Sequence, residues 1–192
     1  MTSNYTSFLS DSLFPSFISS CVPNINLNDL KEEAYLIQDK EKSIDSTNQG
    51  GYHSPAFTGE IKYKHLNKLA QITREFAQDV ADYHHLNVQL SNLTCWVNIN
   101  KEYDYNVLHD HYRADLIGCY YISLKENSGD LVVIRNDGSN YGSLYKNRLD
   151  LLAFDLKAQT GRLYLIPGQL WHYVTANKGQ DDRISVAFNI YF

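Results

Sequence analysis

The second half of the chain, from Val88 onward, is divided into short runs of β-branched and aromatic residues with turn-forming residues between them. Such runs are typical of β-strands, and several of them at this spacing favour a sandwich or a jelly roll. The predicted strands are Leu93 to Asn100, Leu116 to Leu124, Leu131 to Ile134, Leu151 to Phe154, Leu163 to Ile166 and Ile184 to Phe192. We therefore expect residues 88–192 to form a core of two β-sheets.

The first half of the chain, residues 1–87, is predicted to be largely helical. Apolar residues recur with the period of an amphipathic helix between Ile61 and Leu86, and Asn26 to Lys42 has the polar start and charged end of a second helix. The polar segment Ser43 to Ser54 is predicted to be a loop, in a position that would also allow a lid. With 192 residues, the chain is expected to form one α+β domain in which these helices pack against the β core.

Composition and charge limit the partners that we expect. The chain has 43% hydrophobic and 20% charged residues, as globular proteins do, and its net charge is -5. Because it has no cluster of lysine and arginine residues, a nucleic-acid partner is not expected. No apolar run approaches the roughly 20 residues that span a bilayer. The three cysteines form no CxxC pair, so we expect a cytoplasmic protein without disulfides.

Three histidines in the second half are candidates for ligands of one metal ion. On a strand, the side chains of His109 and His111 would point to the same face, while Asp110 would point away. His172 lies several predicted strands further on, where the chain can return alongside. Imidazole nitrogen suits iron, copper, nickel and zinc, and three protein ligands leave coordination positions open for catalysis. Arg183 and Ser185 would lie on one strand face beyond them and could form an acid-binding pocket.

Four stretches of the sequence carry a resemblance to a known family. They are Gly50 to Ser54, Trp96 to Asn100, His109 to His111 with Gly118 to Tyr121, and the region from Gly161 through Pro167, His172 and Arg183 to Asn189. In these motifs, and over most of its length, the chain resembles the 2-oxoglutarate- and Fe(II)-dependent oxygenases, and in particular a bacterial and phage branch with HxH in place of HxD. The resemblance implies a double-stranded β-helix, the cupin-like jelly roll, with N-terminal helices packed against it.

The resemblance also implies a reaction and its cofactors. The protein would use Fe(II), 2-oxoglutarate and dioxygen, with ascorbate as a reductant, to hydroxylate a substrate and release succinate and CO2. The three histidines would hold the iron, and Arg183 and Ser185 would bind the distal carboxylate of the cosubstrate through a guanidinium and a hydroxyl. Asn98, expected on a neighbouring strand, would hydrogen-bond the same cosubstrate.

One position departs from the family's general pattern. The family at large has a carboxylate where this chain has His111, and a neutral imidazole there leaves the iron site one unit more positive. His111 is the predicted third ligand. Asp115 is the alternative, a substitute carboxylate if residues Tyr112 to Ala114 form a turn.

Two other functions are open at this point. A three-histidine metal dioxygenase that needs no 2-oxoglutarate would keep its activity without Arg183, and a non-catalytic jelly-roll binding module would hold no iron. A small molecule or a protein side chain is the expected substrate, and the sequence does not choose between them. The aromatic segment Phe188 to Phe192 would serve either the core or an oligomer interface.

Overall fold

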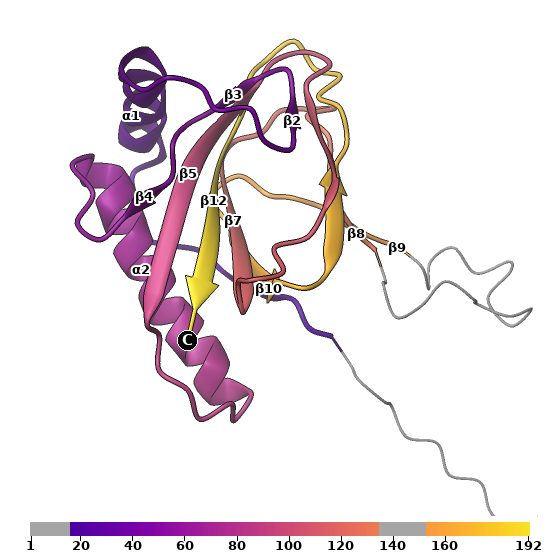
Figure 1. Cartoon of the computed structure of the whole chain (residues 1–192). Helices are drawn as coiled ribbons and strands as arrows, with labels where there is room; N and C mark the ends of the chain where they lie inside the picture. The colour runs from indigo at the N-terminus through magenta and orange to yellow at the C-terminus, as the bar shows by residue number, and fades with distance from the viewer. Residues whose placement is uncertain (1–15, 135–152) are drawn as a thin grey trace, which may run out of the picture.

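The computed structural model describes residues 16–134 and 153–192, which form two antiparallel β-sheets and two helices. The sheets face one another, and both helices lie on the side of the larger sheet that is turned away from the smaller one (Figure 1). The predicted α+β class, with two β-sheets and N-terminal helices packed against them, is confirmed. The first half of the chain, predicted to be largely helical, also contributes four short strands to the sheets in its described part.

Each sheet combines strands from distant parts of the sequence. The larger sheet has the order β1-β10-β7-β12-β5-β3, with β4 also paired to β5. Its strands are β1 (Ser19–Cys21), β3 (Tyr52–His53), β4 (Phe57–Thr58), β5 (Asn92–Asn100), β7 (Leu116–Ser123), β10 (Leu163–Pro167) and β12 (Arg183–Tyr191). The smaller sheet, in the order β2-β6-β11-β8-β9, consists of β2 (Asn48–Gln49), β6 (Tyr105–His109), β8 (Leu131–Ile134), β9 (Ala153–Leu156) and β11 (Trp171–Val174).

The two helices form where the sequence predicts them, and one caps the other. The side-chain oxygen of Asn26 caps α1 (Leu27–Lys40) by accepting from backbone N–H groups of its first turn. No side chain caps α2 (Lys64–Tyr83) from its own N-cap position, Tyr63. Glu33 of α1 accepts two hydrogen bonds from backbone N–H groups of the first turn of α2 instead, at 2.7 and 3.1 Å. This carboxylate therefore satisfies donors that a helix start leaves open and ties the two helices together.

The central strands of the larger sheet separate apolar from polar side chains by strict alternation. Along β12, one face carries Ile184, Val186, Phe188 and Ile190, all fully buried in the cluster that includes the helices. The other face carries Arg183, Ser185, Ala187 and Asn189 and is turned toward the smaller sheet. Since β5 pairs with β12 over nine residues, its side chains sort in the same way. One face of the sheet thus builds the core, and the other is free to build a site.

The segment Ser43 to Ser54 differs from the predicted loop. It contains β2, which pairs with β6 of the smaller sheet, and β3, which pairs with β5 of the larger one. Gly50 joins them at a φ of 71°, and a Cβ there would lie 2.0 Å from a carboxylate oxygen of Asp104. The segment is therefore a bridge between the two sheets. Two-residue strands are too short to show the alternation by which longer strands are predicted.

Three further sequence expectations bear on the described residues. The predicted strand Leu151 to Phe154 is found as β9, which begins at Ala153, and its first two residues lie outside the described ranges, as do residues 1–15. Neither described helix is long and apolar enough to cross a membrane. All three cysteines are free thiols, and burial raises the pKa of Cys21 to about 11 and that of Cys95 to about 12.

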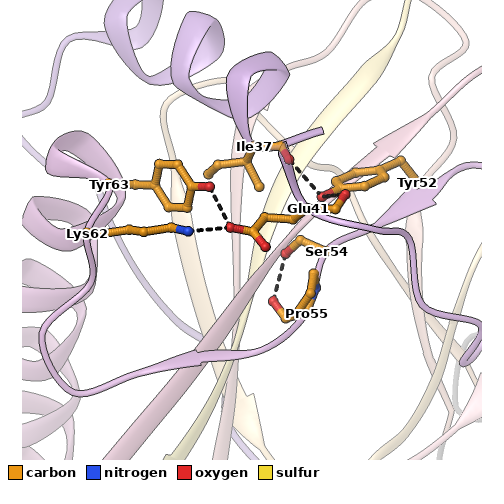
Figure 2. Close-up of polar contacts among 7 residues, drawn as sticks. All are labelled: Ile37, Glu41, Tyr52, Ser54, Pro55, Lys62 and Tyr63. Carbon is orange, nitrogen blue, oxygen red and sulfur yellow. Dashed lines mark hydrogen bonds and ion pairs between the residues drawn. The ribbon is translucent and has the colours of Figure 1, made fainter. Parts of the chain in front are cut away.

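A carboxylate at the end of α1 connects the helices to the bridge segment. Figure 2 shows Lys62 and Tyr63 both pointing to the carboxylate of Glu41: its Oε1 lies 2.6 Å from the Lys62 ammonium and accepts a hydrogen bond of 2.7 Å from the Tyr63 hydroxyl. The Tyr52 hydroxyl of β3 donates to the backbone carbonyls of Ile37 and Glu41, at 3.2 Å each. The bonds from Lys62 and then Tyr63 hold the pKa of the Glu41 carboxyl below its ordinary value of 4.5.

We predict that Glu41→Gln lowers the melting temperature at pH 7 by roughly 1 to 3 °C. The effect is expected to be small because the ion pair of Glu41 with Lys62 is partly exposed and screened by solvent. The folded-state pKa lies below the unfolded one, so the contribution is complete above pH 4.5 and is lost as the pH falls through the folded-state value. Thermal unfolding across this range measures it. Glu60→Gln is the control, since Glu60 is exposed and makes no ion pair with the described part of the chain. A difference between wild type and Glu41→Gln that persists unchanged into acid would contradict the assignment.

Candidate metal centre

Three imidazoles meet at one end of the space between the sheets. His109 is the last residue of β6, His172 lies in β11, and the two are cross-strand partners. His111 follows β6 in a turn. One potential ligand atom of each ring lies within 4.8 Å of the other two, and the ring centroids are 4.3 to 5.1 Å apart. Three imidazoles gathered this closely form a group that could share one metal ion.

The turn brings His111 to the cluster by a route that the sequence argument did not foresee. The prediction placed His109 and His111 on one strand face, but the strand ends at His109. Beyond it, the His111 N–H donates to the Gly168 carbonyl at 3.0 Å, and the Ala114 N–H donates to the His111 carbonyl at 2.8 Å. A Cβ on Gly168 would lie 2.0 Å from the Ala114 carbonyl oxygen, so only glycine lets the turn pack this closely.

Hydrogen bonds at Nδ1 orient two of the rings through the backbone. His109 Nδ1 lies 2.7 Å from the Val107 carbonyl oxygen, and His172 Nδ1 lies 2.9 Å from that of Leu170. A carbonyl oxygen can only accept, so Nδ1 carries the proton in both rings and Nε2 keeps its lone pair. His111 Nδ1 contacts a side chain instead, the Oδ1 atom of Asn189.

Burial keeps the three imidazoles neutral. It lowers the pKa of His109, His111 and His172, and the neighbouring His109 adds to the effect at His172, whose pKa falls to about 3. Neutral rings with free Nε2 lone pairs are the form that binds a metal ion. The cluster is therefore ready to bind a metal at neutral pH without first releasing protons.

Asp115, the alternative ligand, is engaged elsewhere. Residues Tyr112 and Arg113 do form a turn, but the Asp115 carboxylate accepts a hydrogen bond of 2.9 Å from the backbone N–H of Phe192. Among the described residues, the group of metal-binding side chains contains the three histidines and no carboxylate. The geometry thus favours His111 over Asp115 as the third candidate ligand.

A cavity of about 80 Å³ extends from the histidines along the polar face of β12 to Arg183. Arg183 is only 1% exposed, and its Nη1 donates to the carbonyls of Ser128 and Thr175 at 2.8 and 2.9 Å. Its Nη2 is buried without a partner, and Arg183 forms no ion pair with any described residue. A buried guanidinium with an unsatisfied N–H group and no counter-ion costs free energy unless an anion binds it. This part of the cavity wall is therefore suited to bind a carboxylate.

Gly129 makes the room that this guanidinium occupies. Its φ is 85°, and a Cβ there would lie 2.4 Å from the Thr175 carbonyl oxygen and 2.8 Å from Arg183 Nη1. Any side chain at this position would displace the Thr175 carbonyl, which accepts a hydrogen bond from the guanidinium. Gly129 was not singled out from the sequence, because its role depends on a contact between distant segments.

The other predicted cosubstrate residues lie next to Arg183 in the same cavity. Ser185 is on the same face of β12, and Asn98 is its cross-strand partner on β5. The Oδ1 atom of Asn98 is buried without a partner in the described structure. The cavity wall also includes residues to which the sequence argument gave no such role, namely Thr47, Trp96, Asn100, Asn106 and Tyr121. The alternation Trp96, Asn98, Asn100 along β5 is a signal that could have identified two of them.

Comparison with known families matches the part of the chain that builds this cavity. A family model described as "Putative 2OG-Fe(II) oxygenase" matches residues 94–189, which is half of the chain. That range includes all three histidines, Arg183, Ser185 and Asn98. Comparison with curated proteins gives no significant match.

Solved structures with a similar fold cover most of the chain. A prolyl-4-hydroxylase from Pseudomonas putida has a TM-score of 0.65 at 12% identity, with 91% of each chain covered. A prolyl hydroxylase from Trichoplax adhaerens, in complex with a hypoxia inducible factor peptide fragment, has a TM-score of 0.67 at 10% identity, covering 91% of this chain and 83% of that one. HygX from Streptomyces hygroscopicus, with nickel and 2-oxoglutarate bound, has a TM-score of 0.57 at 10% identity, covering 92% of this chain and 83% of that one. These likenesses confirm the predicted double-stranded β-helix.

We predict that the histidine cluster binds one divalent metal ion and that His172→Ala weakens this binding by more than 100-fold. Loss of a residue that hydrogen-bonds a metal ligand already lowers metal affinity by about 10- to 100-fold, and loss of the ligand itself should lower it further. Titration of the metal-free protein with Co(II), followed by its visible absorption, measures the affinity. His84→Ala is the matched control, because His84 lies outside the cluster. Equal affinity in the two variants would exclude the cluster as the site.

Proposed function

This chain belongs to the 2-oxoglutarate- and Fe(II)-dependent oxygenase family, and on that premise we propose that its three clustered histidines hold the iron and Arg183 holds the cosubstrate. The enzyme uses Fe(II) and 2-oxoglutarate as cofactors. Family membership favours the oxygenase over the two alternatives, a three-histidine dioxygenase independent of 2-oxoglutarate and a non-catalytic binding module.

The donor set fits Fe(II). His109, His111 and His172 would hold the ion through three neutral imidazoles, and a set of three protein ligands would leave coordination positions open, as non-haem iron oxygenases require. When bound, iron and cosubstrate would supply the oxidising chemistry, in which a substrate C–H group, 2-oxoglutarate and dioxygen give a hydroxylated product, succinate and CO2. The residues of the chain supply ligands, orientation and a cavity between two sheets.

The observation that carries the proposal is the buried Nη2 atom of Arg183, which has no hydrogen-bond partner among the described residues and lies in the same cavity as the histidines. 2-Oxoglutarate has a second carboxylate, remote from its 2-oxo acid end, which a guanidinium at the far end of the cavity can bind. Ser185 offers a hydroxyl donor beside it, and Asn98 offers a carboxamide on the neighbouring strand. Tyr121, buried next to Ser185 on β7, is a further candidate donor.

The substrate is proposed to be a small molecule or a protein side chain. Proteins with this fold include a prolyl hydroxylase in complex with a peptide and HygX with 2-oxoglutarate bound. Dioxygen is the second substrate of the family's reaction. A cytoplasmic location remains a prediction, supported by the three free thiols.

We predict that Arg183→Gln raises the KM for 2-oxoglutarate roughly 100-fold, since it removes a charged hydrogen-bonding partner from a buried carboxylate. Succinate formed with Fe(II) and ascorbate measures turnover, with or without a coupled substrate. Arg162→Gln is the control, because Arg162 bonds to Ser20 and Gln159 outside the cavity.

Retention of Co(II) binding by Arg183→Gln would establish that the variant is folded. Unchanged dependence on 2-oxoglutarate in that folded variant would contradict the role of Arg183. An iron-loaded wild-type protein that forms no succinate would contradict the proposed function as a whole.

A further inference from the structure

We propose that Asn189 is the positioning residue for His111, holding the ring with Nε2 turned toward the iron. The proposal rests on the proposed function of His111 as a ligand. It concerns the position at which this chain has an imidazole in place of the family's usual carboxylate. No described carboxylate belongs to the cluster, so the geometry of this third ring decides whether the ligand set is complete.

His111 is held differently from the other two histidines. His109 and His172 are anchored to backbone carbonyls two residues away in their own segments. The Nδ1 atom of His111 instead contacts Oδ1 of Asn189, 78 residues further along the chain. Asn189 lies near the end of β12, on the polar face that also carries Arg183 and Ser185. The strand that supplies the cosubstrate residues thus also supports the third ligand.

A second contact fixes the plane of the same ring. Trp96 of β5 stacks on His111, with ring centroids 5.9 Å apart and planes inclined by 19°. His53 of β3 stacks in turn on Trp96, at 5.5 Å and 17°. Stacking limits the tilt of the imidazole but leaves rotation within its plane open. The hydrogen bond from Nδ1 to Asn189 limits that rotation.

The direction of this hydrogen bond decides which nitrogen is free for the metal. When the Asn189 oxygen accepts, the proton is on Nδ1 and Nε2 keeps its lone pair. If the carboxamide were turned and its NH2 group donated, Nδ1 would be the acceptor and Nε2 would carry the proton. In that arrangement Nε2 could not bind a metal. The partner must therefore present an acceptor, which asparagine and aspartate can do and leucine cannot.

The test compares variants that keep or remove the acceptor. Asn189→Leu removes it at similar size, Asn189→Ala removes it without added bulk, and Asn189→Asp keeps it. Thr94→Val is the matched control, since Thr94 is the cross-strand partner of Asn189 on β5. Thermal unfolding identifies the variants that fold, and Asn189→Ala serves if Asn189→Leu does not.

The first measurement is the tautomer of His111 in the metal-free protein at pH 8, read from long-range ¹H–¹⁵N correlations and assigned with His111→Gln. We expect the Nδ1–H form in wild type, Asn189→Asp and Thr94→Val. We expect the Nε2–H form to predominate once the acceptor is removed. The second measurement is Co(II) affinity, which should fall about 10- to 100-fold in Asn189→Leu and Asn189→Ala and stay within a few-fold of wild type in the other two.

The outcomes separate this inference from the proposed function. An Nε2–H tautomer in wild type, or Co(II) affinity that Asn189→Leu and Asn189→Ala leave unchanged at an otherwise intact metal site, would overturn the positioning role alone. A wild-type protein with the expected tautomer that binds no Co(II) would overturn the proposed function and the positioning role with it.

Discussion

The nine-residue antiparallel pairing of β5 with β12 is the contact on which the rest of the structure depends. Because side chains alternate across a sheet, this register sends the apolar residues of both strands into the core with the helices and the polar ones toward the smaller sheet. A shift of one residue would exchange the two faces. Arg183 would then enter the apolar cluster as an unpaired charge, at a cost of several kcal/mol. The alternation that specifies the fold therefore specifies the site as well.

The charges of the proposed site would couple the binding of the metal to the binding of the cosubstrate. Its wall contains neutral histidines and one buried guanidinium, and no described carboxylate lines the cavity. A divalent metal and Arg183 in one small cavity would repel each other, whereas a dianionic cosubstrate compensates both charges. Having His111 in place of the usual carboxylate increases this dependence, because no described residue of the cavity wall supplies a negative charge. Metal and cosubstrate are therefore expected to strengthen each other's binding.

Much of this arrangement could be predicted from the sequence, and the limits have physical reasons. The helices and long strands show their periods over many residues, and Arg183 and Ser185 share a face because β12 is a regular strand. The bridge strands β2 and β3 have two residues each, which is too short for a pattern. His111 reaches the cluster through a turn that depends on Gly168, and Asn189 reaches His111 across the interior of the fold. Such contacts between distant segments are set by tertiary packing and leave no local signal.

The central claim is that three imidazoles and no protein carboxylate hold the iron, with the cosubstrate extending from it to Arg183. A crystal structure of the protein with Mn(II) and 2-oxoglutarate, grown without oxygen, tests this claim most directly. We predict that the metal is bound by Nε2 of His109, His111 and His172, and that the distal carboxylate of 2-oxoglutarate lies against Nη2 of Arg183. A metal bound by Asp115 or another carboxylate of the chain, or a cosubstrate that does not reach Arg183, would contradict it.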